Sequence, residues 1–330
     1  MKLVSVIIPV YNAAAYIHAS VKSVLNQTHA EFELLIVNDG STDNSLELCQ
    51  QITDNRIRII NQCNRGLAGA RNTGIRYARG CYLAFLDADD LWQLDKLERH
   101  VAHLDKNPEV GISYSQSYLM DDEARPMGLV QRPKLKDLAA ADILCRNPVG
   151  NGSSPVFRRE VFEDIKYSSP LSNRDYNLYF DEDFRQSEDI ECWIRIAGTT
   201  QWSFEGIGLP LTGYRINAGG LSANLEAQYA SWNRAIDKAS GYAPALIDTW
   251  GDLARAYQLR YLSRRAIRSR DAKEAIRYIH SALRTDFRIM LKEPKRTSIT
   301  LICAWLLSSL PVPLYRRLET QFISAVRAIA

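Results

Sequence analysis

The 330-residue sequence has no pair of cysteines at C-x-x-C spacing, and its six cysteines stand singly along the chain. This pattern indicates neither a zinc site nor a disulfide framework, so we expect free thiols. The sequence also lacks G-x-G-x-x-G and G-x-x-x-x-G-K-[ST] after any apolar run. Without these glycine-rich phosphate loops, a dinucleotide-dependent dehydrogenase and a P-loop NTPase are disfavoured.

Long apolar runs are also scarce. The first run is interrupted at Pro9 after about seven residues, too short for a signal-peptide core, and is better interpreted as a buried first strand. The longest window without charge, residues 297–315, carries two serines and two prolines near one end. It falls short of the roughly 20 apolar residues of a spanning helix. Three interpretations stay open for this window: a core helix, a segment at a membrane interface and a true span.

Neither sign of charge dominates the whole chain, but each dominates one part of it. Forty-one Lys and Arg stand against thirty-eight Asp and Glu, for a net +3. Residues 251–330 hold sixteen basic and six acidic side chains, a net +10, which leaves residues 1–250 at −7. A basic tail on an acidic body indicates a module that meets an anionic surface or partner. The 46% hydrophobic content excludes a disordered chain.

Short apolar runs alternate with helical patterns over the first hundred or so residues. Strands are expected at 3–9, 32–37, 57–60 and 82–86, and helices at 13–26, 41–52, 67–79 and 96–106. Ser41 and Asp43 stand where the second helix would be capped, and Gly80 stands where the third would end. Four βα units in succession predict an α/β fold with a doubly wound, mainly parallel sheet.

The predicted secondary structure changes twice after residue 110. One more strand is expected at 110–114, and residues 115–180 are loop-rich except for a short helix near 138–145. A helix near 183–197 and strands near 202–206 and 211–216 follow, and from about residue 226 the pattern is helical, with Asp271 as a helix cap. We therefore expect a domain over 1–225, with halves 1–115 and 116–225, and a basic α-helical region over 226–330.

Polar and acidic residues follow three of the predicted strands, at 9–12, 38–43 and 87–90. Parallel sheets bind ligands beyond the carboxyl ends of their strands, so these residues are expected at one site. Asp87 and Asp89 are two carboxylates in D-x-D spacing, which suits Mg²⁺ or Mn²⁺ with open positions for phosphate oxygens. The alternative is a capping role, in which Asp89 or Asp90 accepts from amides near Trp92.

Five segments in order resemble the family 2 glycosyltransferases. They are SVIIPVYN, SVLNQT, ELLIVNDGSTDNS, the segment 64–75 and YLAFLDADDLW. The resemblance is dense over residues 3–115 and looser over 150–216. It implies a GT-A (Rossmann-like) nucleotide-diphospho-sugar domain with a C-terminal helical region, and an inverting sugar transfer.

The resemblance also implies roles for individual residues on the donor side. Pro9, Tyr11 and Asp39 would line the nucleobase pocket, with Asp39 accepting from a base N–H. Arg71 would approach the nucleotide from the third βα unit. Asp87 would lie near the ribose and the metal.

Further roles concern the reaction itself. Asp89 would be the direct ligand of a divalent cation, Mn²⁺ or Mg²⁺. Asp189, in SEDIECW, would be the general base that removes a proton from the acceptor hydroxyl. Arg215 matches a position that often faces the diphosphate, although the residues after it, 216–220, depart from the usual pattern. A structural role for Arg215 is the alternative. Residues 151–153 would lie beside the donor sugar and the acceptor.

The sequence has no Q-x-x-R-W motif, which in this family marks processive synthases. A non-processive enzyme is implied, adding one sugar from a UDP-sugar to a glycan or lipid-linked acceptor of bacterial lipopolysaccharide, capsule or exopolysaccharide. The basic tail suits a cytoplasmic enzyme bound to the inner face of the cytoplasmic membrane. A catalytically inactive nucleotide-sugar-binding or scaffold protein is the alternative. No nucleic-acid partner is expected, because no basic motif is interleaved with aromatic residues.

Overall fold

The first part of the sheet is parallel, as the apolar runs predict. The computed structural model describes residues 2–168, 177–216, 224–311 and 313–315. Four strands pair in parallel in the order β3-β2-β1-β4. They are β1 (Val4–Val10), β2 (Phe32–Asn38), β3 (Ile57–Asn61) and β4 (Tyr82–Phe85), each within one residue of its expected range. Their carboxyl ends therefore meet at one edge of the sheet.

The strands form long apolar runs because both faces of the sheet are covered. All of β1 and β2 is buried, and alternate residues belong to different cores. Ile7 and Leu35 pack on one face, whereas Ile8 and Leu34 pack on the other. Successive side chains of a strand point to opposite faces, so a strand covered on both sides needs apolar residues at nearly every position.

Helices α1 (Ile17–Leu25), α2 (Ser45–Gln50) and α3 (Gly66–Tyr77) follow the first three strands, and α4 (Lys96–Lys106) follows β4. The expectation for Gly80 as the residue that ends α3 is wrong, because α3 ends at Tyr77 and Ala78 is extended. Gly80 instead passes close to β1. Its amide donates to Ser5 Oγ at 2.8 Å, and an added Cβ would lie 2.5 Å from the Ser5 nitrogen.

The second part of the sheet is mixed. Strand β8 (Val156–Arg158) lies between β4 and β6 (Val110–Met120) and is antiparallel to both. Strand β9 (Ser203–Arg215) runs parallel to β6, and the short β5 (Leu91–Trp92) pairs with its far side. Strand β7 (Pro126–Gln131) forms a hairpin with β6 and is exposed along its whole length.

One expectation about this part is corrected. Residues 202–206 and 211–216 were expected as two strands, but they belong to the single strand β9. The pairing of β9 with β6 shifts register between Ser115 and Ser117, opposite Ile207–Thr212. The shift lets one strand continue past Pro210, which has no amide hydrogen for the ladder.

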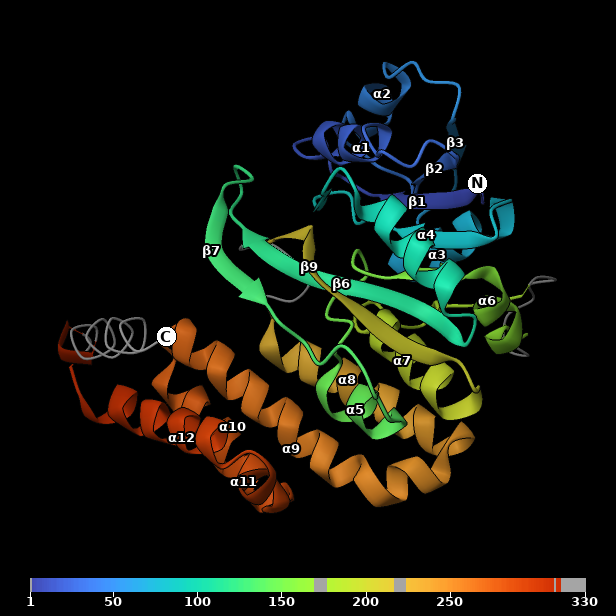
Figure 1. Cartoon of the computed structure of the whole chain (residues 1–330). Coiled ribbons are helices and arrows are strands. Elements are labelled where there is room, and N and C mark those ends of the chain that lie inside the picture. Colours follow the sequence, from blue (N-terminus) through green and yellow to red (C-terminus); the bar gives the residue numbers. More distant parts are fainter. Residues whose placement is uncertain (1, 169–176, 217–223, 312, 316–330) are drawn as a thin grey trace.

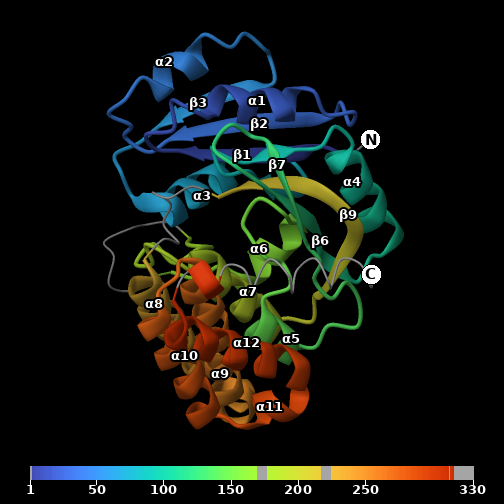
Figure 2. The ribbon, with the colours of Figure 1, turned by 90° about the vertical axis from the view of Figure 1, so that its left-hand side faces the viewer.

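Helices form a second layer below the sheet (Figures 1 and 2). Three of them, α5 (Ala140–Arg146), α6 (Arg159–Ile165) and α7 (Glu188–Thr199), come from the middle of the chain. The C-terminal region adds α8 (Leu225–Tyr242), α9 (Pro244–Arg268), α10 (Ala272–Thr285), α11 (Arg288–Lys292) and α12 (Pro294–Ser309). Trp232 and Ile236 of α8 share a core with Leu144 and Ile194, so the C-terminal helices are continuous with the rest.

Helix α10 begins where the sequence predicts a cap. The carboxylate of Asp271 accepts from the Glu274 amide at 3.0 Å and caps α10, as expected.

The uncharged window at 297–315 is mostly occupied by helix α12. Within the described part of the chain, no helix has the length and apolar content that a membrane crossing requires.

Candidate active site

The loops after β1 and β2 are joined by polar contacts. Asn12, with φ +50°, accepts from the Thr42 amide at 2.8 Å, and its own amide donates to Ser41 Oγ. The Ala14 amide donates to Asp43 at 3.1 Å. Ser41 therefore bonds to the loop after β1, whereas Asp43 bonds both to that loop and to the Ser45 amide at the first residue of α2, at 3.0 Å. The N-cap residue of α2 is Asn44, whose side chain makes no capping bond. These contacts join the two loops at strand ends that are adjacent in the sheet.

Three residues expected at a nucleobase pocket lie along this edge. Pro9 is buried in β1, and the Tyr11 side chain that follows it is 52% exposed. Asp39 is buried directly after β2. Its carboxylate accepts from the Gln62 side chain and from the amides of Arg65 and Gly66, all between 2.6 and 2.8 Å. These donors fix the orientation of Asp39 at the start of α3, and its expected contact with a base stays a prediction.

The loop after β4 carries the D-x-D pair. Asp87 and Asp89 are half-buried, whereas the next residue, Asp90, is buried. Asp90 Oδ2 accepts from Ser153 Oγ at 2.6 Å, and the same hydroxyl accepts from the Asp87 amide at 3.0 Å. Burial, together with the charges of Asp89 and Asp87, raises the pKa of Asp90 well above its ordinary value. Asp90 therefore holds the loop through its buried carboxylate, next to the half-buried D-x-D pair.

Arg215 clamps the same loop from the end of β9. Its amide donates to Asp90 Oδ1 at 2.9 Å, and its Nε donates to the Asp89 carbonyl at 2.7 Å. Its Nη1 donates to the carbonyls of Asp121 and Asp122. The buried guanidinium thus holds backbone oxygens and lies against the Tyr16 ring. The expected contact with a diphosphate stays a prediction, and residues 217–220 of the same expectation lie outside the described residues.

Arg71 was expected to approach the nucleotide, and the structure places it under the site. It is only 2% exposed. Its Nη2 donates to Asp87 at 2.8 Å and its Nη1 donates to Glu188 at 2.6 Å, so it joins the D-x-D loop to the first turn of α7. Burial lowers the pKa of Arg71, but the carboxylates of Asp87, Glu188 and Asp189 outweigh burial and raise it above its ordinary value. Arg71 is charged at any pH at which the protein folds.

Asp189 lies in the first turn of α7, at the same edge of the sheet. Its Oδ1 accepts from the Ile190 amide at 2.7 Å. Burial and the neighbouring Glu188 charge raise the pKa of Asp189 to about 7, against an opposing effect of Arg71. The charge of Asp87 adds to the increase, since the two carboxylates are close enough to interact. A carboxyl group that titrates near neutral pH suits a general base.

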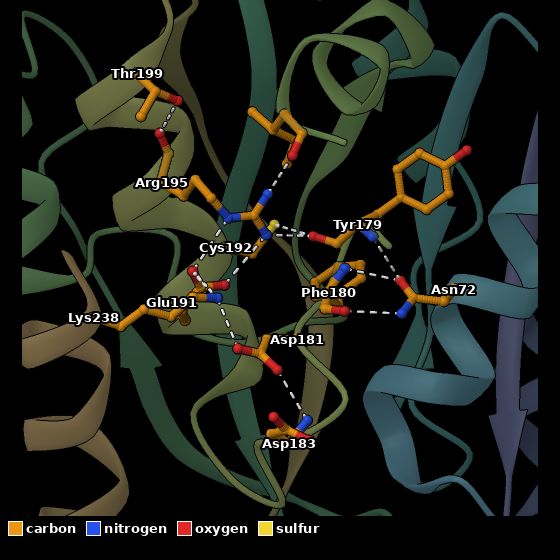
Figure 3. Close-up of polar contacts among 11 residues, drawn as sticks. Asn72, Tyr179, Phe180, Asp181, Asp183, Glu191, Cys192, Arg195, Thr199 and Lys238 are labelled. Carbon is orange, nitrogen blue, oxygen red and sulfur yellow. Dashed lines mark hydrogen bonds and ion pairs between the residues drawn. The ribbon is translucent and has the colours of Figure 1, made fainter. Parts of the chain in front are cut away.

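The segment before α7 is held by a side chain that sequence reasoning did not single out. Asn72, on α3, accepts from the amides of Tyr179 and Phe180 at 3.1 and 2.8 Å. It donates to the Phe180 carbonyl at 2.8 Å and to Glu182 at 3.0 Å. Figure 3 shows Asn72 reaching this segment from one side while α7 lies on the other. The buried amide therefore fixes the chain that leads into Asp189.

Helix α7 is itself fixed by a buried carboxylate. Glu191 contacts the guanidinium of Arg195 at 3.2 Å and the ammonium of Lys238 on α8 at 2.9 Å. Lys238 also contacts Asp181 at 2.7 Å, and Arg195 donates to the Tyr179 carbonyl (Figure 3). In the sequence, this network is indicated only by Glu191, an acidic residue two positions after the candidate base.

The expected divalent cation was tested against the side chains at this edge. Asp87 and Asp89 supply carboxylate oxygens, which suit hard cations. The charges of both raise the pKa of Asp90, an excess of negative charge that a cation would relieve. Among the residues that the structure describes, no group of three or more His, Cys, Asp or Glu side chains is arranged to hold a metal. The two carboxylates could therefore supply only part of a cation's ligand set.

Comparison with known proteins gives the family. The family model described as Glycosyl transferase family 2 matches residues 5–166. The chain is 47% identical over 223 residues to the Escherichia coli UDP-Glc:alpha-D-GlcNAc-diphosphoundecaprenol beta-1,3-glucosyltransferase WfgD, covering 67% of this chain and 80% of the relative. The chain belongs to glycosyl transferase family 2. The chain spans about half, 55%, of the length of another relative, an uncharacterized glycosyltransferase of Nostoc that is 38% identical over 52% of the chain.

Solved structures agree on the fold of this family 2 glycosyltransferase. The TarS structure from S. aureus in complex with UDP-GlcNAc has a TM-score of 0.61 at 17% identity, covering 98% of this chain and 92% of that one. The mannosyltransferase PcManGT from Pyrobaculum calidifontis, in complex with GDP-Man and Mn²⁺, has a TM-score of 0.56 at 22% identity, with 92% and 86% covered. Both matches extend through the C-terminal helices. The predicted GT-A type fold with a C-terminal helical region is confirmed.

Proposed function

We propose that this glycosyltransferase moves a single sugar from a nucleotide-diphospho-sugar to a hydroxyl of a lipid-linked glycan, with inversion at the anomeric carbon. The observation that carries the proposal is the pairing of two features at one edge of the sheet. Asp189 has a pKa of about 7, and Arg71 joins its helix turn to the loop that ends in Asp89. A base and a diphosphate site so joined suit a single displacement.

The chemical step uses the chain's own carboxylate as base. The ionised Asp189 carboxylate takes the proton of the acceptor hydroxyl while the hydroxyl oxygen bonds to the anomeric carbon. The bond from that carbon to the diphosphate oxygen breaks, and its electron pair leaves with the nucleoside diphosphate. Because attack and departure occur on opposite faces of the sugar, the anomeric configuration inverts. Asp189 must therefore stand across the sugar from Asp89.

The donor is proposed to lie along the strand ends already described. Pro9, Tyr11 and Asp39 would line the base, and Asp87 would lie near the ribose. A divalent cation, Mn²⁺ or Mg²⁺, held by Asp89 would neutralise charge on the leaving diphosphate. The Mn²⁺ bound in the mannosyltransferase PcManGT supports the choice of cation. Arg71 and Arg215 would act by holding the loop, since both are buried and bonded to it.

The acceptor is proposed from the relatives. WfgD and WfaP of Escherichia coli are named for UDP-Glc and a diphosphoundecaprenol-linked acceptor. We assign this chain a UDP-sugar, a lipid-linked acceptor of cell-surface polysaccharide synthesis and a place at the cytoplasmic face of the membrane. Residues 1–225 would carry the two substrate sites, and residues 226–330 would support them and contact the membrane. No Q-x-x-R-W motif is present, so one sugar is added per encounter.

The proposal is tested with a panel of nucleotide sugars and Mn²⁺. The correct donor should raise the Tm, because a ligand that binds the folded state stabilises it by RT ln(1 + [L]/Kd). Asp89→Asn should lose this shift, whereas Asp248→Asn, an exposed aspartate on α9, should keep it. Asp189→Asn should keep the shift and lose transfer to a lipid-linked acceptor.

Two results would contradict the proposal. If Asp89→Asn binds every donor as the wild type does, the cation and diphosphate are not at this loop. If the wild type binds a donor and transfers no sugar to any lipid-linked or soluble acceptor, the alternative of a nucleotide-sugar-binding protein is correct.

A further inference from the structure

Helix α12 is packed along one side and exposes large apolar side chains on the opposite side. One side packs on the helices beneath it and consists of Thr297, Thr300, Ala304 and Leu307. The other side is exposed and carries Ile299, Ile302, Trp305 and Leu306. At about 3.6 residues per turn these two sets lie on opposite faces. A helix packed on one side usually exposes polar residues on the other, so the exposed apolar side needs a separate explanation.

The exposed side is part of a larger apolar surface. Seven of the sixteen large hydrophobic side chains that are exposed in the described chain lie between residues 287 and 314. Besides the four on α12 they are Phe287, Leu291 and Leu314, and Leu291 is the most exposed of all at 73%. Figure 1 shows α11 and α12 at the outer side of the helical layer, away from the sheet. We call the exposed residues of 287–311, together with Leu314, the outer helical surface.

The charges on the outer helical surface are of one sign. Arg288, Lys292, Lys295 and Arg296 are exposed. Helix α12 contains no acidic residue. The acidic residues beside it already have partners. Asp286 is buried and bonded to Arg288, whereas Glu293 accepts from Arg146 and Arg260 and lies 3.8 Å from Arg296.

Exposed apolar and basic side chains on the same surface favour one kind of partner over another. A second copy of the chain, related by a two-fold axis, would bring the same basic residues against each other. An anionic lipid bilayer instead offers negative headgroups for the basic side chains and acyl chains for the apolar ones, and Trp305 suits the boundary between them. We propose that the outer helical surface binds the surface of an anionic bilayer, with Ile302, Trp305 and Leu306 inserted among the headgroups. This proposal rests on the membrane contact proposed above for residues 226–330 and assigns that contact to named side chains.

The proposal is tested by flotation of the full chain with lipid vesicles. We expect the protein to float with vesicles of phosphatidylcholine and phosphatidylglycerol, and to stay behind with phosphatidylcholine alone. The double variant I302D/L306D should lower the floated fraction at least tenfold. The matched control M127D/L129D places two charges on exposed apolar residues of β7 and should float as the wild type does. Brominated lipids should quench Trp fluorescence in the wild type and less in Trp305→Phe.

Several outcomes would overturn the proposal. The wild type failing to float with anionic vesicles is one, and I302D/L306D floating as well as the wild type is another. A wild-type dimer in light scattering that I302D/L306D dissociates would assign the surface to a second copy. The Tm shift produced by the nucleotide sugar should be equal in the wild type and I302D/L306D. That comparison shows that the variant folds, and it separates failure of this proposal from failure of the proposed function.

Discussion

Arg71 and Glu188 stand 117 residues apart in the sequence, and the Arg71 Nη1 donates to Glu188 Oε1 across 2.6 Å in the buried floor of the site. The other end of the same guanidinium holds Asp87 at 2.8 Å. A planar, two-pronged donor fixes both partners in direction as well as distance. Arg71 thereby sets how far the D-x-D loop lies from the helix turn that carries Asp189.

Removing the charge of Arg71 should destabilise the fold. In Arg71→Met, two carboxylates that are largely buried lose their cation, which costs about 3–5 kcal/mol in comparable buried pairs. Urea unfolding followed by circular dichroism measures the loss. Arg125→Met is the matched control, because Arg125 also contacts two acids, Asp121 and Glu123, but is 72% exposed. Equal midpoints for both variants would mean that the Arg71 bridge is not structural.

The transfer rate should depend on the ionisation of Asp189. A general base acts in its deprotonated form, so kcat/KM should rise with pH up to about 7, the pKa of Asp189, and level off above it. Asp189→Asn should lower kcat by about 10²–10⁴-fold, a typical contribution of a general base. Steady-state kinetics between pH 5 and about 9 give the profile. A flat profile in the wild type would assign the base elsewhere.

The ionisation of Asp189 should also lower the stability of the folded protein as the pH rises. The pKa of Asp189 is raised in the folded state from 3.8 to about 7, so the folded protein holds this proton more tightly than the unfolded chain. The contribution is full below the unfolded pKa and is lost as pH rises through about 7. Asp189→Asn has no such loss. The Tm of the variant minus that of the wild type should therefore increase between pH 4 and about 8, as read by calorimetry.

A side chain at Gly152 should destabilise the folded protein. A Cβ at this position would lie 2.4 Å from Arg71 Nη2, and that guanidinium is pinned by two carboxylates. Gly152→Ala should thus cost about 1–3 kcal/mol, as overpacking does, and lower the transfer rate by shifting Arg71. Gly241→Ala is the control, since nothing lies within 4 Å of its added Cβ. The Tm of each variant is compared with that of the wild type. If Gly152→Ala keeps the wild-type Tm, Arg71 moves aside without cost.

Local features of the sequence were sufficient for the first part of the fold. The four parallel strands follow from apolar runs that must be buried on both faces, and Asp271 caps α10 because a cap is a contact over three residues. The insertion of β8 between β4 and β6 could not be predicted in this way. Pairing between distant strands depends on packing of the whole chain, and no periodicity in a short window encodes it.

The site divides along the same line. The D-x-D pair and Asp189 were predicted from residue type and family resemblance, and the raised pKa of Asp189 supports its role. Asp90 was predicted only as a possible helix cap and Ser153 only as a residue beside the donor sugar, and Asn72 was given no role. Their observed partners lie far away in the chain. Their sequence neighbourhoods contain nothing that distinguishes a buried hydrogen-bond partner from an ordinary polar residue.

By itself, the sequence determined the α/β class, the family and the opposite charges of the body and the tail, because composition and local pattern carry these properties. Only the tertiary structure decided that Arg71 is a buried bridge, as a side chain's partners depend on which distant segments the fold brings together. It also decided which side of α12 is buried and that large apolar side chains lie on its exposed side. An apolar helix looks the same in sequence on every side, and only its neighbours determine which side water can reach.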